Sequence, residues 1–522
     1  MIEPRFFDVL PSALLVTFGD RIDTSLIRRI AWFRQWIRES CNEGVLDAIP
    51  SYTTILILYD PCVKSVRTLS TQLSFGWKHL EDVEFDPESG IDTIPVVYGD
   101  DFGEDLPGVA AHSGLTVEEV ITRHAGATYT VGALGFAPGF TYLAGLPQEL
   151  ATPRRDRPRL RVPAGSVGIG GEQTGIYALP TSGGWNLIGR TPEQLFDPSA
   201  DPPVWLRMGD QVRFRPIPAD AWVEPVFSAS SDLAPDGPIE VIAPGMQTTV
   251  QDLGRSGYGD IGFSPNGAAD RQSLIAANRA VGNRDETPAL EMTFTGPQLR
   301  FRRRLTIAVC GADLGPMLNG LPLPPGRPQD VMPGDELVFV RPEGSRGIRA
   351  YLAVAGGIDV PPVMGSASTD LTAGIGGYRG RALQAGDRIP VGRREGDAPG
   401  RVVPPYRHDD GPLRVLPGPQ RDRFPDETWE NLISSDFTVS SEANRVGVRL
   451  LGPSLRPVGG ADIISEGIVT GSIQVTGEGQ PIVMLPGHAT IGGYTKIATV
   501  IEEDWDRLGQ LAPGDTVRFR EA

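Results

Sequence analysis

Lysine and cysteine are scarce in this chain of 522 residues. Only Lys64, Lys78 and Lys496 are lysines among 48 basic residues, and none lies in a GxxxxGK[ST] sequence or beside methionine. The sequence therefore contains no P-loop for a nucleotide and no lysine in the setting that carries biotin. The three cysteines are far apart and form no CxxC pair, which excludes a disulfide framework and fits the reducing cytoplasm, where we expect the protein.

Other absences narrow the range of functions. The five histidines show no HxH or HExxH spacing, so we expect no protein-ligated metal. The longest strongly apolar run, near 52–59, is too short to span a bilayer, and the first residues lack a signal-peptide pattern. Acidic residues outnumber basic ones by 65 to 48, a formal charge of −17, which repels phosphate groups. We therefore expect neither nucleic acid nor a membrane as a partner.

Glycine (64) and proline (48) are abundant, and they separate many short apolar segments. This pattern predicts short strands joined by tight turns, in an α+β protein that is mostly β. Near the start, a strand at 13–18, a helix after Asp23 or Thr24 that runs through Ile37, a buried strand at 51–59 and a second helix at 65–77 indicate a small α/β layer of the βαβ type.

The length predicts three to four domains. We place the α/β layer at 1–93, a β-rich unit at 94–218, a linker at 219–238, a third unit at 239–400 and a last unit at 401–522, with a weaker break at 393–412. The second and last units share a repeat. Gly-Ser, Gln and Gly-Gly-aromatic recur in order from Gly165 to Trp185 and from Gly471 to Tyr494, so we expect 160–192 and 466–500 to follow one path.

Several polar residues of the last unit are candidates for a site. His488, in a glycine-rich turn, is the best candidate for acid–base work, with Glu466 as the other possible base. Arg445 and Arg449 lie four residues apart, which on one strand face would present two guanidinium groups to a carboxylate or phosphate. Lys496 adds a point charge for an oxyanion; the remaining candidates here are Gln474 and Tyr494.

Two segments of the second unit are further candidates. Gly135–Phe140 places Phe136 and Phe140 around glycine and proline, where aromatic rings could wall an apolar pocket. The cluster Arg154–Arg161 is a basic segment in an acidic protein, and Arg161 could bind a carboxylate or phosphate. A tight structural loop and a solvated loop are the respective alternatives.

The longer motifs resemble known families. Leu134–Phe140, Pro158–Ile169, Gln173–Tyr177 and Gly183–Arg190 are similar to the B subunit of 5-oxoprolinase, also called allophanate hydrolase subunit 1 or the sporulation kinase inhibitor. Gly245–Arg255, Pro265–Asp270 and Gly380–Leu383 resemble the C subunit of that enzyme, or allophanate hydrolase subunit 2, of the biotin-dependent carboxyltransferase family. The resemblance covers about 8–520 and implies a fusion of the two, B before C, with cyclophilin-like β-barrel lobes at 94–218 and 401–522.

The resemblance implies a function that depends on partners. It points to an ATP-dependent hydrolase, with ATP and Mg²⁺, that opens 5-oxoproline (pyroglutamate), a small cyclic amide, to glutamate together with a separate A subunit. The same modules resemble the carboxyltransferase portion of urea carboxylase, in which the active site lies between the halves. This implies, as an alternative, carboxyl transfer from carboxybiotin to urea or a related amide, with biotin carboxylase and biotin carrier chains as partners. The third alternative is a protein that binds and inhibits a histidine kinase.

Two loops depart from the family pattern. The usual Gly-Ala-Met-Asp is Gly267-Ala-Ala-Asp270, and the usual Ala-Asp-(Arg/His) is Pro486-Gly-His488. If these loops line the site, the resemblance leaves the identity of the amide substrate open.

Overall fold

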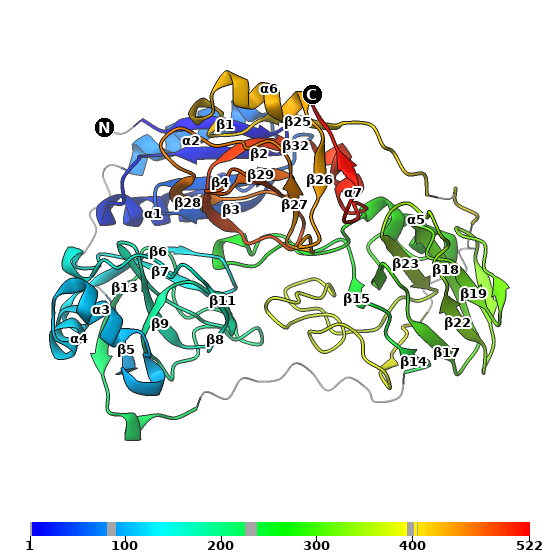
Figure 1. Cartoon of the computed structure of the whole chain (residues 1–522), viewed down its shortest axis with the longest axis horizontal. Helices are drawn as coiled ribbons and strands as arrows, with labels where there is room; N and C mark the ends of the chain where they lie inside the picture. The colour runs from blue at the N-terminus through cyan, green and yellow to red at the C-terminus, as the bar shows by residue number, and fades with distance from the viewer. Residues whose placement is uncertain (1–2, 81–89, 225–236, 394–400, 405) are drawn as a thin grey trace.

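The computed structural model describes residues 3–80, 90–224, 237–393, 401–404 and 406–522. Residues 225–236 of the expected linker lie outside this set, as do 394–400 and 405 of the weaker break. Four units follow one another along the chain (Figure 1). In the described ranges, no helix is long and apolar enough to cross a membrane.

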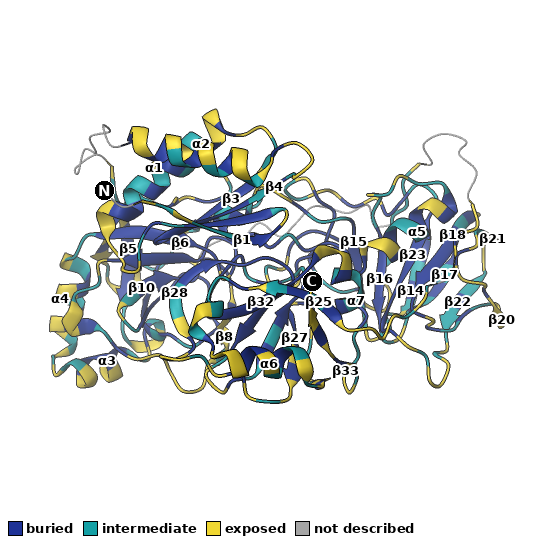
Figure 2. Ribbon diagram, turned by 90° about the horizontal axis from the view of Figure 1, so that it is seen from above, coloured by how far each residue is buried: buried dark blue, intermediate teal, exposed yellow. Residues whose placement is uncertain are grey.

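The first unit has two helices and four antiparallel strands, in the order β1-β2-β4-β3, which form one end of an 11-stranded sheet that continues into the second unit where β3 pairs with β6. Its elements are β1 (Arg5–Leu10), β2 (Ala13–Thr17), α1 (Thr24–Ser40), β3 (Val45–Ser51), β4 (Thr54–Tyr59) and α2 (Val66–His79). Asp23 caps α1 by accepting hydrogen bonds from the backbone N–H groups of Ser25 and Leu26, as its position in the sequence predicts. The outer faces of α1 and α2 are exposed, whereas the strands beneath are buried (Figure 2).

One part of the expected α/β layer is wrong. The segment 51–59 is not one strand, because Tyr52 and Thr53 turn the chain between β3 and β4. β4 is inserted between β2 and β3, so the crossover through α1 joins two strands that are not neighbours. The turn carries apolar residues because it is buried: the Tyr52 backbone N–H donates to the carbonyl of Gly132 in the next unit at 2.8 Å.

The second unit is a closed barrel in the order β6-β13-β5-β12-β9-β10-β7, with β7 pairing back to β6. Its first strand, β5, starts at Ile91, so the expected boundary at 93/94 falls inside a strand. Thr116 and Glu119 form the capping box that the sequence indicates for α4. The elements are β5 (Ile91–Tyr98), α3 (Leu106–Ser113), α4 (Val117–Gly126), β6 (Tyr129–Leu134), β7 (Thr141–Ala144), β8 (Arg159–Val162), β9 (Ser166–Gly170), β10 (Gln173–Ile176), β11 (Thr181–Gly183), β12 (Asn186–Arg190) and β13 (Gln211–Pro216).

The third unit consists of two sheets, ordered β20-β19-β22-β17-β14-β24 and β15-β16-β23-β18-β21, with α5 against β18 and β23. Its elements are β14 (Ile239–Ala243), β15 (Gln247–Gln251), the short helix η5 (Gly259–Ile261), α5 (Arg271–Val281), β16 (Ala289–Thr293), β17 (Gln298–Phe301), β18 (Leu305–Gly311), β19 (Pro316–Leu318), β20 (Leu321–Pro322), β21 (Gln329–Val331), β22 (Glu336–Phe339), β23 (Arg349–Val354) and β24 (Arg388–Ile389). Asp270 accepts from the Ser273 N–H and so caps α5.

The last unit is a second, nearly closed barrel, ordered β33-β26-β27-β30-β29-β32-β25-β34. Its two end strands are consecutive pieces of chain around Arg518, which brings the ends of the sheet together. The elements are β25 (Leu413–Pro417), α6 (Asp426–Ser434), β26 (Phe437–Val439), β27 (Gly447–Leu451), β28 (Asp462–Gly467), β29 (Ser472–Val475), β30 (Pro481–Met484), β31 (Ile491–Tyr494), β32 (Lys496–Val500), α7 (Trp505–Leu508), β33 (Thr516–Val517) and β34 (Phe519–Glu521).

The repeat predicted from the sequence is confirmed. Five strands in 159–190 pair antiparallel as β8–β11, β9–β10 and β9–β12, and five in 462–500 pair antiparallel as β28–β31, β29–β30 and β29–β32. Each barrel also pairs its first strand parallel with its last, β5 with β13 and β25 with β34. The expected fold class, mostly β with barrel lobes, is therefore confirmed.

The last barrel packs on the first unit, although the two are far apart in sequence (Figure 1). The Ser51 hydroxyl donates to the carbonyl of Ser465 at 2.6 Å. Gly467 lies so close to β4 that a Cβ there would be 2.3 Å from the Cβ of Leu56. A side chain at residue 467 would therefore separate these two units.

Candidate functional site

A pocket of about 550 Å³ lies where three units meet, and we call it the junction pocket. The first unit contributes residues within 10–13 and 46–61, the third contributes residues within 253–271, and the last barrel contributes residues within 468–470, 486–490 and 502–505. The pocket is therefore assembled from both halves of the chain. Concave sites of this size at domain boundaries are where proteins most often bind small molecules.

His488, which the sequence analysis selected as a possible base, lines this pocket and is 3% exposed. Burial lowers the pKa of its ring to about 4, so the imidazole is neutral near pH 7. Nδ1 lies 2.7 Å from the carbonyl oxygen of Ala489. Because a carbonyl oxygen can only accept, the proton is assigned to Nδ1, and Nε2 keeps the lone pair that a general base needs.

Arg255 supplies a cation to the same pocket and is 5% exposed. One of its nitrogens donates to the carbonyl of Ser368 at 2.7 Å, but Nε and Nη1 are buried and have no hydrogen-bond partner in the part of the chain that is described. Burial lowers the pKa of the guanidinium, against the attraction of Asp370 and Asp252. Unsatisfied buried donors are costly, so this guanidinium is suited to an anionic ligand such as a carboxylate.

Two more pocket residues carry polar groups. Thr490 is 1% exposed, and its hydroxyl is buried without a hydrogen-bond partner among the described residues. Asp47 accepts from the backbone N–H groups of Ala48 and Gly259, each at 2.8 Å. Burial, followed by the nearby charge of Asp260, raises the pKa of Asp47 to about 6. Shifted pKa values in a pocket often mark functional groups.

Arg255, Thr490 and Asp47 are not among the site residues predicted from the sequence. Arg255 ends the Gly245–Arg255 motif and Thr490 ends the turn that contains His488, so two of the three lie in segments that the sequence does indicate. Nothing in the sequence around Asp47 signals its role, because its burial depends on contact with Gly259 of the other half.

Lys496 and Glu466 form a buried ion pair beside the junction pocket, with side chains 1% and 8% exposed. Gln420 joins them: its amide donates to Glu466 at 2.7 Å, and its oxygen accepts from the Lys496 backbone N–H at 3.0 Å. The Nε2 of Gln474 is buried without a hydrogen-bond partner in the described ranges. Gln474 contacts Gly492 together with Ile468, which lines the pocket. These charges therefore lie next to the pocket, not in it.

The two barrels differ at this position. By register, Lys496 opposite Gln474 corresponds to Leu187 opposite Gly168 in the first barrel. The Leu187 backbone N–H donates to Asp105, just as that of Lys496 donates to Gln420. A buried lysine thus replaces a buried leucine in the same fold, and burial of a charge is too costly to arise without a partner or a role. The Lys496–Glu466 pair therefore distinguishes the last barrel from the first at this position.

The structure separates Arg445 from Arg449, and their expected common strand face is wrong. Arg445 precedes β27, is buried, and forms an ion pair with Glu291 of the third unit while donating to the carbonyl of Gly267. Arg449 lies on β27 with its side chain 50% exposed, and its nearest acid is the exposed Glu442 at 3.7 Å. Arg445 therefore holds two units together, and its guanidinium is already occupied.

The remaining candidates lie elsewhere. Arg449 and Tyr494 line an open depression of about 670 Å³ that also touches Pro158 of the first barrel. Arg161 is exposed. Phe140 is buried in an aromatic cluster with Tyr142, Tyr177 and Trp185, so it belongs to the core.

Phe136 is 37% exposed, in the loop 135–140. This loop contacts the other half of the chain, since the Gly139 N–H donates to the Ile261 carbonyl at 3.0 Å and Gly135 lies against Ile491. The loop is thus part of the contact between the halves.

Comparison with known families gives two matches that together span most of the chain. The model of the carboxyltransferase domain, subdomain C and D, matches residues 4–206, and that of the carboxyltransferase domain, subdomain A and B, matches residues 261–521. The chain belongs to the carboxyltransferase domain family. In this carboxyltransferase domain the junction pocket takes residues from both matched regions.

Relatives of known name match the two halves separately. The B subunit of the 5-oxoprolinase of Escherichia coli O157:H7 is 51% identical over 174 residues, which are 33% of this chain and 78% of the relative. The C subunit of the 5-oxoprolinase of Escherichia coli K12 is 40% identical over 281 residues, 54% of this chain and 90% of the relative. The urea amidolyase of Saccharomyces cerevisiae is 34% identical over 306 residues, 54% of this chain and 16% of that protein.

Solved structures agree with this assignment. The crystal structure of TTHA0988 is 37% identical, with a TM-score of 0.85, and the match covers 97% of this chain and 99% of TTHA0988. The structure of the Kluyveromyces lactis urea carboxylase is 34% identical with a TM-score of 0.51, over 56% of this chain and 28% of that protein. The fused arrangement of this carboxyltransferase domain is therefore shared with TTHA0988 over 97% of this chain.

Proposed function

We propose that the chain is the fused B and C component of a 5-oxoprolinase that opens 5-oxoproline to glutamate with hydrolysis of ATP. The support from sequence is that one chain matches two different subunits of that enzyme, each over most of its length. The A subunit would be a separate chain.

The observation that carries the proposal is the set of unsatisfied polar groups in the junction pocket. 5-Oxoproline has a carboxylate next to a five-membered amide. The free nitrogens of Arg255 would bind the carboxylate, and the Thr490 hydroxyl would orient the ring. The lone pair on Nε2 of His488 would accept a proton from the water molecule that attacks the amide carbon. Asp47, through Gly259, would hold the pocket wall in place.

ATP and its Mg²⁺ do not fit the residues of this chain by themselves. The sequence has no P-loop lysine. In the ranges that are described, no group of three His, Cys, Asp or Glu side chains is placed to hold a metal ion. We therefore assign the nucleotide to the A subunit, which would supply the activation that a stabilised amide needs.

Both loops that depart from the family pattern reach the junction pocket. Ala268 and His488 line it, and Ala269 takes the place of the usual methionine next to Ala268. Because both departures lie in loops that reach the pocket, a substituted cyclic amide is the first alternative substrate within the same reaction class.

The test is reconstitution with a separate A subunit, followed by measurement of glutamate released with ADP. We expect Arg255→Gln to lower kcat/KM for 5-oxoproline about 30- to 1,000-fold, the cost of a charged hydrogen bond in a dry site. Arg449→Gln, in the exposed depression, is the matched control and should keep full activity. Wild-type activity in Arg255→Gln would place the substrate elsewhere. Failure of the chain to support any ATP-dependent lactam hydrolysis would refute the function.

Carboxyl transfer is the second candidate, favoured by the family description and the urea amidolyase match. Here the chain would accept carboxybiotin from a carrier chain and carboxylate urea or a related amide. Transfer of labelled carboxyl from a carboxylated carrier to urea, in the absence of any 5-oxoprolinase partner, would establish it. Inhibition of a histidine kinase, the third hypothesis, would need no polar pocket, and the junction pocket does not favour it.

A further inference from the structure

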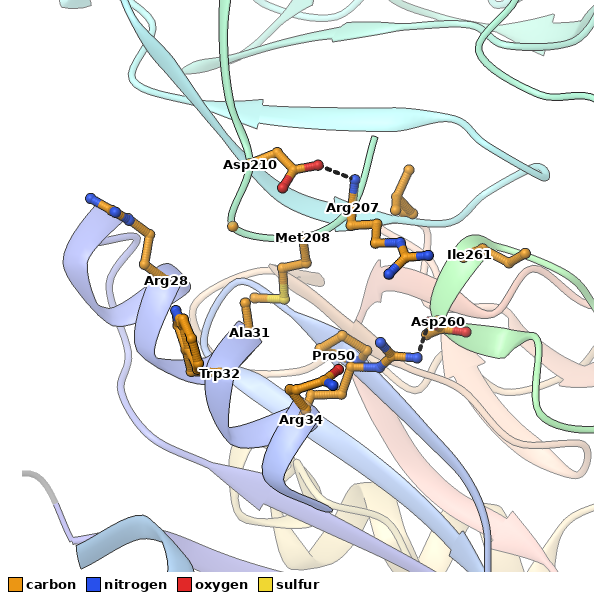
Figure 3. A pocket seen from close by; sticks show the side chains of 13 residues that line it. Arg28, Ala31, Trp32, Arg34, Pro50, Arg207, Met208, Asp210, Asp260 and Ile261 are labelled. Atoms are coloured by element: carbon orange, nitrogen blue, oxygen red, sulfur yellow. Dashed lines mark hydrogen bonds and ion pairs between the residues drawn. The ribbon is translucent and has the colours of Figure 1, made fainter. Parts of the chain in front are cut away.

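A second pocket also borders η5, through Asp260 and Ile261, and we call it the α1 pocket. It has a volume of about 250 Å³, room for roughly eight water molecules at about 30 Å³ each or for a molecule of amino-acid size. Figure 3 shows it between α1, the turn before β13 and η5, so three units enclose it. Neither the proposed reaction nor the candidates from the sequence use this pocket.

The charged residues of the α1 pocket are three arginines, Arg28, Arg34 and Arg207, and two aspartates, Asp210 and Asp260. Arg34 forms an ion pair with Asp260 through one terminal nitrogen, while its Nε is buried and has no hydrogen-bond partner within the described part of the chain. The buried Nε of Arg34 is therefore an unused guanidinium donor next to this pocket, and a guanidinium donor suits an anionic ligand.

Arg207 is the residue most open to a ligand. Its backbone N–H donates to Asp210 at 2.7 Å, which fixes the base of the side chain. Its guanidinium makes no hydrogen bond or ion pair with any described residue. Burial raises the pKa of Asp260, and the charges of Arg34, Arg38 and Arg207 offset part of that rise, so Arg207 lies near this carboxylate. Figure 3 shows the guanidinium groups of Arg207 and Arg34 on the same side of the pocket.

The rest of the lining is apolar. It includes Ala31, Pro50, Leu134, Met208 and Ile261. Such walls disfavour a compact, fully hydrated anion, because the apolar surface stays in contact with water. They favour an anion with a hydrocarbon part. Asp210 and Asp260 would repel a second negative charge, which argues against phosphate.

We propose that the α1 pocket is a second ligand site, which binds a small organic monocarboxylate through Arg207 and Arg34 and its hydrocarbon part through the apolar wall. The site is separate from the junction pocket but shares an element with it. Asp260 of η5 faces the α1 pocket, and its neighbour Gly259 lines the junction pocket, where it donates to Asp47. A ligand bound here would contact the segment that forms the wall of the proposed active site.

The experiment measures binding of butyrate and benzoate to the whole purified chain by ligand-observed NMR, with inorganic phosphate as the contrasting anion. We expect saturable binding of the carboxylates and weaker binding of phosphate. Arg207→Ala should weaken carboxylate binding about 10- to 100-fold, the cost of a charge-assisted hydrogen bond. Arg207 is exposed, so the variant should fold as the wild type does.

Two variants make the assignment specific. Arg213→Ala removes another exposed arginine, on β13 with its Nε on Thr128, and should leave binding unchanged. Ala31→Leu fills the pocket without removing a charge and should also abolish binding. The proposal is overturned if binding of butyrate and benzoate does not saturate, if Arg207→Ala binds them as tightly as the wild type does, or if phosphate binds more tightly than these carboxylates. None of these readouts depends on enzymatic activity, so they stand apart from the proposed function.

Discussion

The contrast between Arg445 and Arg449 leads to a quantitative prediction. The Arg445 side chain is 8% exposed and its partner Glu291 is 1% exposed, so Arg445→Ala leaves a carboxylate buried without its closest counter-charge. Breaking a buried ion pair in this way costs about 3–5 kcal/mol. Because Arg349 remains, with its Nε 3.8 Å from Glu291, we expect the lower end, about 3 kcal/mol. Arg449→Ala, in a half-exposed pair, should cost less than about 1 kcal/mol.

The assay is native-state hydrogen exchange, since a chain of several units need not unfold in one step. Segments 265–271 and 444–448, which meet at this ion pair, should lose protection in Arg445→Ala and keep it in Arg449→Ala. Arg445→Lys keeps the positive charge but not the forked donors of the guanidinium, so its hydrogen-exchange protection should lie between that of the two alanine variants. Equal protection in the two alanine variants would refute the reasoning and return Arg445 to the list of residues free for substrate.

The same ion pair predicts a dependence on pH. Burial alone would raise the pKa of Glu291, but Arg445, Arg349 and hydrogen bonds from Ala269 and Tyr351 together hold it below its ordinary value of 4.5. A lowered pKa in the folded state contributes stability that is present above pH 4.5 and is lost as the pH falls through the folded value. Arg445→Ala should therefore lose less protection on acidification than the wild type.

Three other predictions follow from the site and the contacts between units. His488→Gln should lower kcat/KM in the reconstituted enzyme about 10²- to 10⁴-fold. Because the pKa of the ring is about 4, the plot of wild-type kcat/KM against pH should show no inflection from His488 between pH 6 and 8. An inflection in that range that disappears in the variant would contradict the assignment. Gly467→Ala should lower the melting temperature, whereas Gly477→Ala, with open space around it, should not; equal effects would mean that the contact between the units is loose. Lys496→Leu should cost about 3 kcal/mol, measured as lost hydrogen-exchange protection in 462–500, and adding Glu466→Gln should recover part of it, whereas additive losses would show that the pair is not coupled.

Much of the fold follows from local signals in the sequence. The Asp23 cap and the Thr116–Glu119 capping box are set by residues within one turn of their helices, so the helices are predictable from neighbouring residues. The repeat of glycines and aromatics predicted that two distant segments share one strand path, because turns that need glycine recur in the same order. The inserted strand β4 could not be predicted, since its turn at Tyr52 is buried by another unit.

The candidate functional residues also fall into those that the sequence indicates and those that only the folded structure brings together. The sequence by itself determined the family motifs, the scarcity of lysine that makes Lys496 conspicuous, and the turn that contains His488. Only the tertiary structure decided that Arg255, Asp47 and His488 surround one pocket, and that Arg445 is held by Glu291. The physical reason is that the burial of a side chain and its ion pairs depend on which residues surround it. Segments more than 400 residues apart, such as those of Asp47 and His488, become neighbours only when the chain is folded.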